Sequence, residues 1–117
     1  MTTYTLNFYG LKRELPLTYI GRNKRIANVN ILGDIEFTEK AGEILEKKLR
    51  KQKIIPDTFV GPEEIISYVY NLGLRFHHKR FVVLRSKVKR YMVDPIVENP
   101  PLGSPEHVRS LVLNNID

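Results

Sequence analysis

The chain has 117 residues, of which 42% are hydrophobic and 27% are charged, and this balance is typical of one globular domain rather than a disordered segment. It contains no cysteine, which excludes disulfides, thiolate zinc sites and a cysteine nucleophile. The 19 Lys and Arg residues outnumber the 13 Asp and Glu residues, and the net charge of +6 favours anionic partners such as nucleotides, sugar phosphates or nucleic acid.

The N-terminus lacks the basic start and the apolar core of a signal peptide. No apolar run approaches the roughly 20 residues that a helix needs to span a bilayer. We therefore expect a cytoplasmic protein without a membrane partner.

Three short extended segments with tight connections are predicted first, at residues 4–9, 13–20 and 26–32. The first of them alternates polar and apolar residues with the period of a half-buried strand. In the second, Pro16 lacks a backbone N–H and should confine the strand to the edge of a sheet. Together the segments predict a small antiparallel flap over residues 1–33.

Two helices are predicted next. Thr38 is the expected N-cap of the first helix, whose buried stripe comprises Ala41, Ile44, Leu45 and Leu49. Cations at the carboxyl end of this helix are explained by the helix dipole, so we assign them no function. The second helix is expected to begin at Pro62 and to end at Gly73.

Short apolar runs on either side of the second helix predict parallel strands at 58–60 and 81–84, joined by one crossover. A final strand is expected at 108–113. Parallel sheets are normally covered on both faces by other elements, and two strands with one crossover do not supply enough chain to cover both faces. Either the antiparallel strands complete the sheet, or the chain is part of something larger, such as a homo-oligomer.

The run at 81–84 ends in a cluster of cations: Arg85, Lys87, Lys89 and Arg90. Ligands of open α/β sheets bind outside the carboxyl ends of the strands. The cluster is therefore placed to meet a polyanion, with phosphate as the commonest candidate. The alternative is a solvated basic loop with no specific ligand.

Motifs for catalysis are sparse. The sequence has neither a glycine-rich phosphate loop nor a spacing that indicates a Ser–His–Asp triad. His77 and His78 are adjacent and would point in different directions on a strand or a helix, so we expect no protein metal site there. Aromatic residues alternate with cations in the second half, which keeps single-stranded nucleic acid as an alternative partner. Most of these rings are expected in the core, so nucleic acid is the least favoured partner.

The ordered segments resemble the adenine-type purine phosphoribosyltransferases along nearly the whole chain. The most specific pieces are Gly10-Leu-Lys-Arg-Glu-Leu-Pro16 and Lys89-Arg-Tyr-Met92. Members of that family join a purine base to 5-phosphoribosyl diphosphate with Mg²⁺ and release pyrophosphate. The resemblance implies an α/β fold class: a partial phosphoribosyltransferase-type parallel sheet with flanking helices in residues 34–117, and an N-terminal antiparallel hood or flap in residues 1–33.

The resemblance also implies site residues. Arg85 matches the arginine at the end of the family's strand, and Lys89 matches a lysine of its flexible loop. The implied diphosphate-binding residues are Arg85, Lys87, Lys89 and Tyr91, and the implied base-binding residues of the hood are Asn30, Ile31 and Leu32. The implied partners are 5-phosphoribosyl diphosphate with Mg²⁺, a purine base or nucleotide, and further copies of the chain.

The sequence departs from the family pattern in three places. Ser86 stands where the family usually has lysine, and residues 61–66 carry two acids where the family has a small, glycine-containing pyrophosphate loop. The loop that binds the ribose 5-phosphate in the family would follow Asp117. We therefore expect a transferase that is incomplete or weak as given, or a non-catalytic nucleotide-binding, phosphate-binding or assembly module that retains the fold.

Overall fold

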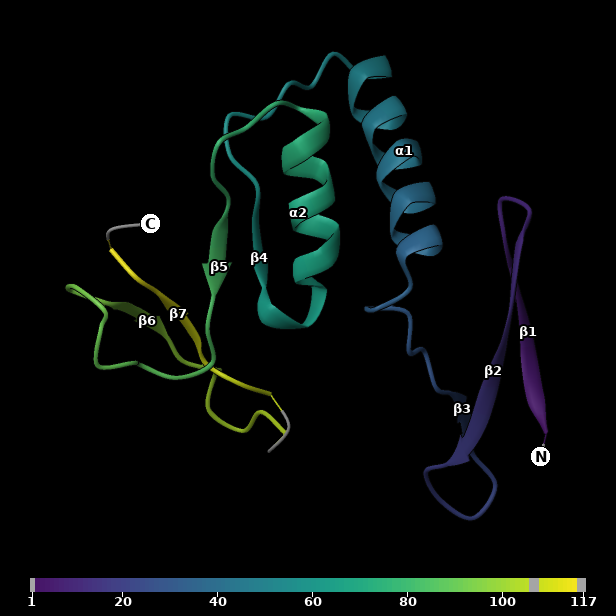
Figure 1. The fold of residues 1–117 in the computed structure, drawn as a ribbon. Helices are drawn as coiled ribbons and strands as arrows, with labels where there is room; N and C mark the ends of the chain where they lie inside the picture. Colours follow the sequence, from purple (N-terminus) through teal and green to yellow (C-terminus); the bar gives the residue numbers. More distant parts are fainter. Residues whose placement is uncertain (1, 106–107, 116–117) are drawn as a thin grey trace.

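The computed structural model describes residues 2–105 and 108–115, which form a mixed α/β structure in three adjacent groups (Figure 1). An antiparallel sheet at one side contains β1 (Thr3–Phe8), β2 (Leu11–Tyr19) and β3 (Arg25–Ala27). The middle group contains α1 (Ile35–Lys51), β4 (Val60–Pro62), the 3₁₀ turn η1 (Glu63–Ile65), α2 (Ile66–Arg75) and β5 (Val82–Leu84). The antiparallel pair β6 (Ile96–Glu98) and β7 (Leu111–Leu113) lies at the other side.

The antiparallel flap predicted at the N-terminus is confirmed, but the prediction that Pro16 confines its strand to an edge is wrong. β2 lies between β1 and β3. Pro16 is tolerated there because it pairs with Thr3, the first residue of β1, where that ladder ends. On the side of β3, the Pro16 carbonyl accepts a hydrogen bond from the Asn28 N–H at 2.7 Å. The ladder between β2 and β3 ends at Leu17, so no strand hydrogen bond on this side needs an N–H group from Pro16.

The flap contacts the beginning of α1 through one ring stack and one set of ion pairs. Phe8 stacks on Phe37, with ring centroids 4.5 Å apart. Arg13 donates to Asp34 at 2.6 Å and 3.1 Å, and to Glu36 at 2.8 Å. These contacts fix the flap to the first turn of the helix.

Asp34 is the N-cap of α1, so the prediction that Thr38 caps this helix is wrong. The Asp34 carboxylate accepts a hydrogen bond from the Phe37 N–H at 3.0 Å, as an N-cap side chain does. Thr38 lies inside the helix, where its hydroxyl donates to the Asp34 carbonyl at 2.8 Å. The helix begins one turn earlier because the Asp34 carboxylate satisfies one of its first free N–H groups, that of Phe37.

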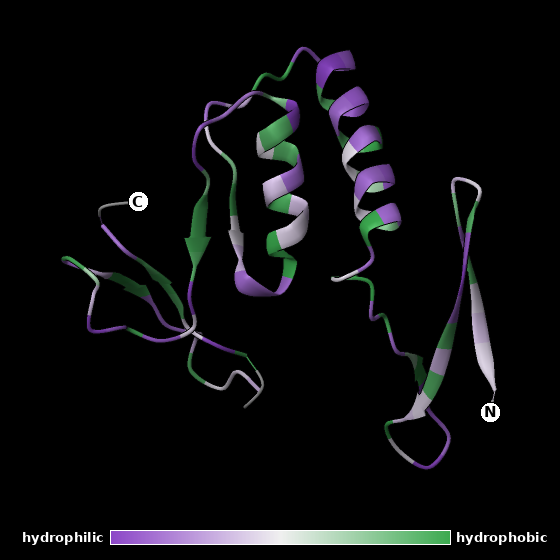
Figure 2. Cartoon of the chain, in the orientation of Figure 1, coloured by the Kyte–Doolittle hydropathy of each residue, from purple (hydrophilic) through white to green (hydrophobic). Residues whose placement is uncertain are grey.

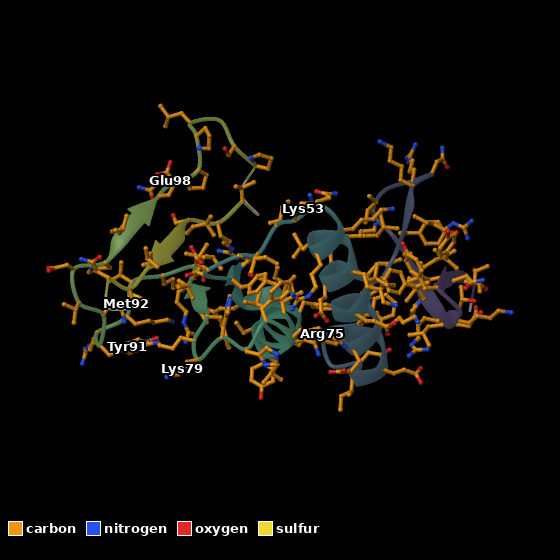
Figure 3. The ribbon with its side chains drawn as sticks, turned by 90° about the horizontal axis from the view of Figure 1, so that it is seen from above. Lys53, Arg75, Lys79, Tyr91, Met92 and Glu98 are labelled. Carbon is orange, nitrogen blue, oxygen red and sulfur yellow. The ribbon has the colours of Figure 1, made fainter. Side chains whose placement is uncertain are left out.

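α1 and α2 pack closely where Gly42 meets Asn71, a buried polar residue. Asn71 donates to Glu39 and accepts from Arg75 Nε at 2.7 Å. The same guanidinium reaches the Glu39 carbonyl at 3.0 Å and Glu46 at 3.3 Å. Figure 3 shows Arg75 between the two helices. A glycine and a polar network, rather than an apolar seam, therefore join the helices here.

Both helices end in a Schellman motif with a non-glycine residue in the left-handed region. At the end of α1, Lys53 has φ 60°, and the Ile54 N–H donates to the Leu49 carbonyl. At the end of α2, His77 has φ 59°, and the His78 N–H donates to the Gly73 carbonyl. The predicted end of the second helix at Gly73 is therefore wrong: the helix runs to Arg75, and its reversal occurs at His77.

β4 and β5 form the predicted parallel pair, with Gly61 opposite Val83. The first strand covers Val60–Pro62 rather than 58–60, so the expectation that the second helix begins at Pro62 is wrong: Pro62 ends β4, and α2 begins at Ile66 after the turn η1. The face of this pair that carries Gly61 is covered by α2, because a β-carbon at Gly61 would lie 2.4 Å from Val69. Val60 lies on the other face and is 53% exposed. β7 meets the end of β5 through one isolated antiparallel bridge between Val112 and Arg85, but β4 and β5, β6 and β7, and the flap form three separate sheets. The antiparallel strands therefore do not complete the parallel sheet. The predicted strand at 108–113 is limited to β7.

The buried hydrophobic core within the described ranges is small and consists of Leu15, Phe37, Ala41, Val69, Phe76 and Val112. Figure 2 shows that β5, β6 and β7 are mainly hydrophobic, whereas much of α1 is hydrophilic. Among the helices that the structure describes, none combines the length and apolar character needed to cross a membrane.

Candidate functional site

Arg85 lies at the carboxyl edge of the parallel pair, directly after β5. Its backbone makes two hydrogen bonds with Val112 of β7, at 2.9 Å and 2.8 Å, which fix the end of the strand. Glu63 follows β4 at the same edge, and its carboxylate lies 3.4 Å from Arg85 Nη1. The two side chains are 38% and 45% exposed, so this long ion pair faces solvent and contributes little to stability. The guanidinium can therefore exchange Glu63 for a stronger anion.

Arg109 is a second arginine at this edge that sequence reasoning did not identify. It lines a crevice of about 30 Å³ together with Glu63, Arg85, Ser86 and Ser110. The crevice is too small for a diphosphate, so an anion would bind on the surface above it. Arg109 comes next to Arg85 because β7 pairs with the end of β5, a long-range contact that no local pattern indicates.

Lys87, Lys89 and Tyr91, the other predicted diphosphate-binding residues, lie on the exposed loop that follows Arg85. The loop turns tightly at its far end, where the Met92 N–H donates to the Lys89 carbonyl at 3.1 Å. Figure 3 shows Tyr91 and Met92 at the side of the molecule away from α1. The structure thus presents the predicted cations on one solvent-facing loop.

The predicted base-binding residues Asn30, Ile31 and Leu32 connect the flap to α1 and are held against the start of α2. The Ser67 hydroxyl donates to the Leu32 carbonyl at 2.9 Å, and the Tyr68 hydroxyl donates to the Ile31 carbonyl at 3.2 Å. Burial raises the pKa of Tyr68 above the usual range of a tyrosine hydroxyl. Two carbonyl oxygens of the segment are therefore already hydrogen-bonded.

One residue of each predicted set lines a hollow, and the two hollows differ. Leu32 lines a groove of about 500 Å³ between α1 and α2, whereas Arg85 lines the crevice beside Glu63. Both nevertheless lie at the end of the molecule where α2 begins, because Ser67 contacts Leu32 and Glu63 immediately precedes α2. The structure gathers the basic residues, but it does not bring them into one pocket with the predicted base-binding segment.

The ion pairs of Arg13 with Asp34 and Glu36 connect the flap to the start of α1. The guanidinium of Arg13, and after it the Phe37 N–H, lower the pKa of Asp34 from 3.8 to about 2. The hydrogen bonds to Asp34 and Glu36 in turn raise the pKa of Arg13. Both groups therefore remain charged throughout the physiological pH range, so the ion pair between the flap and the start of α1 is retained.

In the part of the chain that the structure describes, no group of three or more His, Asp or Glu side chains could hold a metal ion. Glu63 and Glu64 are the carboxylates next to the basic edge. Mg²⁺ is commonly held by one or two carboxylates together with substrate phosphates, and Glu63 is paired with Arg85 in this structure.

The chain matches no protein-family model and no curated protein.

Proposed function

We propose that this protein binds 5-phosphoribosyl diphosphate at the carboxyl edge of β4 and β5, and that it is a purine phosphoribosyltransferase-like protein. The observation that carries the proposal is the loop 85–92. It leaves the parallel pair at the edge where ligands of α/β sheets bind, and it carries Arg85, Lys87, Lys89 and Arg90.

The cations have complementary roles in this proposal. Arg85, fixed by its backbone bonds to Val112, offers a planar fork to two phosphate oxygens. Lys87 and Lys89 are point charges on a loop that can close over the ligand. A pyrophosphate leaving group gains negative charge as its bond to the ribose breaks, and cations that neutralise this charge would lower the barrier.

Mg²⁺ supplies further charge neutralisation when it is bound. Glu63 and Glu64 would hold it together with the diphosphate, which would remove the repulsion between these acids and the ligand. Glu63 would then have to release Arg85. The purine base would lie by Asn30, Ile31 and Leu32, a segment that Ser67 and Tyr68 hold at the same end of α2.

A non-catalytic binding module is the second candidate, and one observation favours it. The predicted base-binding segment and the basic edge line separate hollows, whereas transfer requires the base nitrogen and the ribose carbon to be in contact. Such a module would bind the phosphate compound without joining it to a base.

Calorimetric titration of the protein with 5-phosphoribosyl diphosphate and Mg²⁺ tests the proposal. We expect micromolar binding, which the double change Arg85→Ala with Lys89→Ala weakens about 100-fold, because two charge-assisted hydrogen bonds are each worth about 1.5 kcal/mol. The matched control is Lys48→Ala with Lys51→Ala at the end of α1, which removes the same charge elsewhere. An equal loss in the control would show non-specific attraction, and no binding by the folded protein at millimolar ligand would refute the proposal.

A transfer assay with labelled adenine separates the two candidates. Nucleotide formation that depends on Arg85 and Lys89 identifies a transferase. Binding without turnover identifies the non-catalytic module.

A further inference from the structure

The protein exposes more surface than a compact monomer of its size. Its accessible surface is 9213 Å², whereas a folded monomer of this mass exposes about 6,600 Å². Its radius of gyration is 17.3 Å, compared with about 13 Å for a compact domain of this length. The excess of about 2,600 Å² is as large as the area that one protomer buries in an extensive homodimer.

The groove between α1 and α2, which we call the interhelix groove, is an exposed apolar surface. Its volume is about 500 Å³, and its apolar walls are formed by Leu32, Ile35, Ile66, Tyr70, Leu74 and Phe81. Ile35 is 80% exposed, and Tyr70 and Leu74 are each 55% exposed. Large apolar side chains gathered around one hollow in this way are typical of an interaction surface.

The interhelix groove is also almost free of charge on a strongly basic chain. Glu39 is its one charged lining residue among those the structure describes, and the Glu39 carboxylate already bonds Asn71 and Arg75. Charged residues are depleted in the cores of protein interfaces, and homodimer cores are the most apolar. Two copies that each carry a net charge of +6 repel one another, so they should meet where cations are fewest.

We infer that the interhelix groove is the self-association surface of this protein, and that its occupant is a second copy of the chain. In a two-fold arrangement the same surface serves both protomers, so each copy must supply both a projection and a hollow. The groove supplies both, because Ile35 of α1 and Tyr70 of α2 are large, exposed side chains that line it. The inference does not rest on diphosphate binding, because the groove does not include the loop 85–92. Leu32 lines the groove, so a second copy bound there would lie against one residue of the proposed base-binding segment.

Sedimentation velocity of the full chain tests the inference, with two matched substitutions. We expect the wild-type protein to sediment as a dimer at micromolar concentration and Leu74→Lys to sediment as a monomer. Leu102→Lys is the control: it makes the same chemical change at a fully exposed leucine outside the groove, and it should remain dimeric. A monomeric wild-type protein, a dimeric Leu74→Lys protein, or an equal effect of both changes would overturn the inference.

Cysteine cross-linking provides a second test with a different readout. Because the chain has no cysteine, Tyr70→Cys and Leu102→Cys each create a single thiol. A bismaleimide should join two copies of the Tyr70→Cys protein but not of the Leu102→Cys protein. Cross-linking of Leu102→Cys alone would place the interface elsewhere. If the wild-type protein is monomeric and binds an apolar dye in the groove, the groove is a small-molecule site instead. This result, or cross-linking of Leu102→Cys alone, would overturn the inference.

Discussion

Gly42→Ala is expected to destabilise the protein although alanine is the better helix former. A β-carbon at position 42 would lie 1.8 Å from Asn71 Oδ1 and 2.8 Å from Arg75 Nε, so Asn71 must move. The movement would break the bonds that Asn71 makes to Glu39 and Arg75. Two bonds to charged partners are worth about 3 kcal/mol, and the gain in helix propensity returns about 1 kcal/mol. The expected net loss is about 2 kcal/mol.

Gly73→Ala is the matched control, because a β-carbon at this position of α2 meets no atom within 4 Å. This change should stabilise the protein by about 1 kcal/mol. Thermal unfolding followed by circular dichroism should therefore show Tm values that move in opposite directions, by about 8 °C downward for Gly42→Ala and about 4 °C upward for Gly73→Ala.

The double variant Gly42→Ala with Asn71→Ala tests the stated cause. Without the Asn71 side chain the clash disappears, so the two losses should be far from additive. A Gly42→Ala protein as stable as the wild type, or strict additivity in the double variant, would refute the close approach of α1 and α2 described above.

Three further predictions concern helix ends, pH and the network between the helices. Lys53→Gly and His77→Gly should each raise the free energy of unfolding by about 1 kcal/mol in urea titrations, because both residues adopt left-handed φ; lower stability would contradict this backbone geometry. Asp34 has a depressed pKa, so its stabilising contribution should be complete above about pH 3.8 and disappear as the pH falls towards about 2. The free energy of unfolding, measured against pH, should therefore fall more steeply at acidic pH for the wild type than for Asp34→Asn. Parallel curves for the two proteins would refute a stabilising role of ionised Asp34. Arg75→Met should loosen the contact between α1 and α2 and speed amide exchange in α2, whereas Arg90→Met on the exposed loop should leave exchange unchanged; equal exchange in both proteins would contradict this.

Much of the chain order follows from local patterns. The alternation at 4–9 predicts β1, and the apolar runs around 58–60 and 81–84 predict the parallel pair. The position of Arg85 at the edge of the sheet follows from the same pattern, because a cation directly after the apolar run of a strand must lie at the end of that strand.

The features that the sequence did not reveal depend on long-range contacts. Asp34 is the N-cap of α1 and also the partner of Arg13, 21 residues earlier, so the stripe of α1 alone did not locate the start of the helix. Gly73 continues α2 because the left-handed residue is His77, a residue type that rarely signals a helix end. Arg109 reaches the basic edge only through the bridge between Arg85 and Val112.

The double engagement of Asp34 has a consequence for communication within the molecule. The Asp34 carboxylate both caps α1 and binds Arg13 of the flap. Detachment of the flap and fraying of the first turn of α1 are therefore energetically coupled through this one side chain. Coupling of this kind is reciprocal: a ligand that tightens the flap on residues 30–32 must also order the start of α1, to the same extent that an ordered α1 favours the ligand. The amide of Phe37, which donates to Asp34, is therefore a reporter of flap occupancy that can be followed by hydrogen exchange.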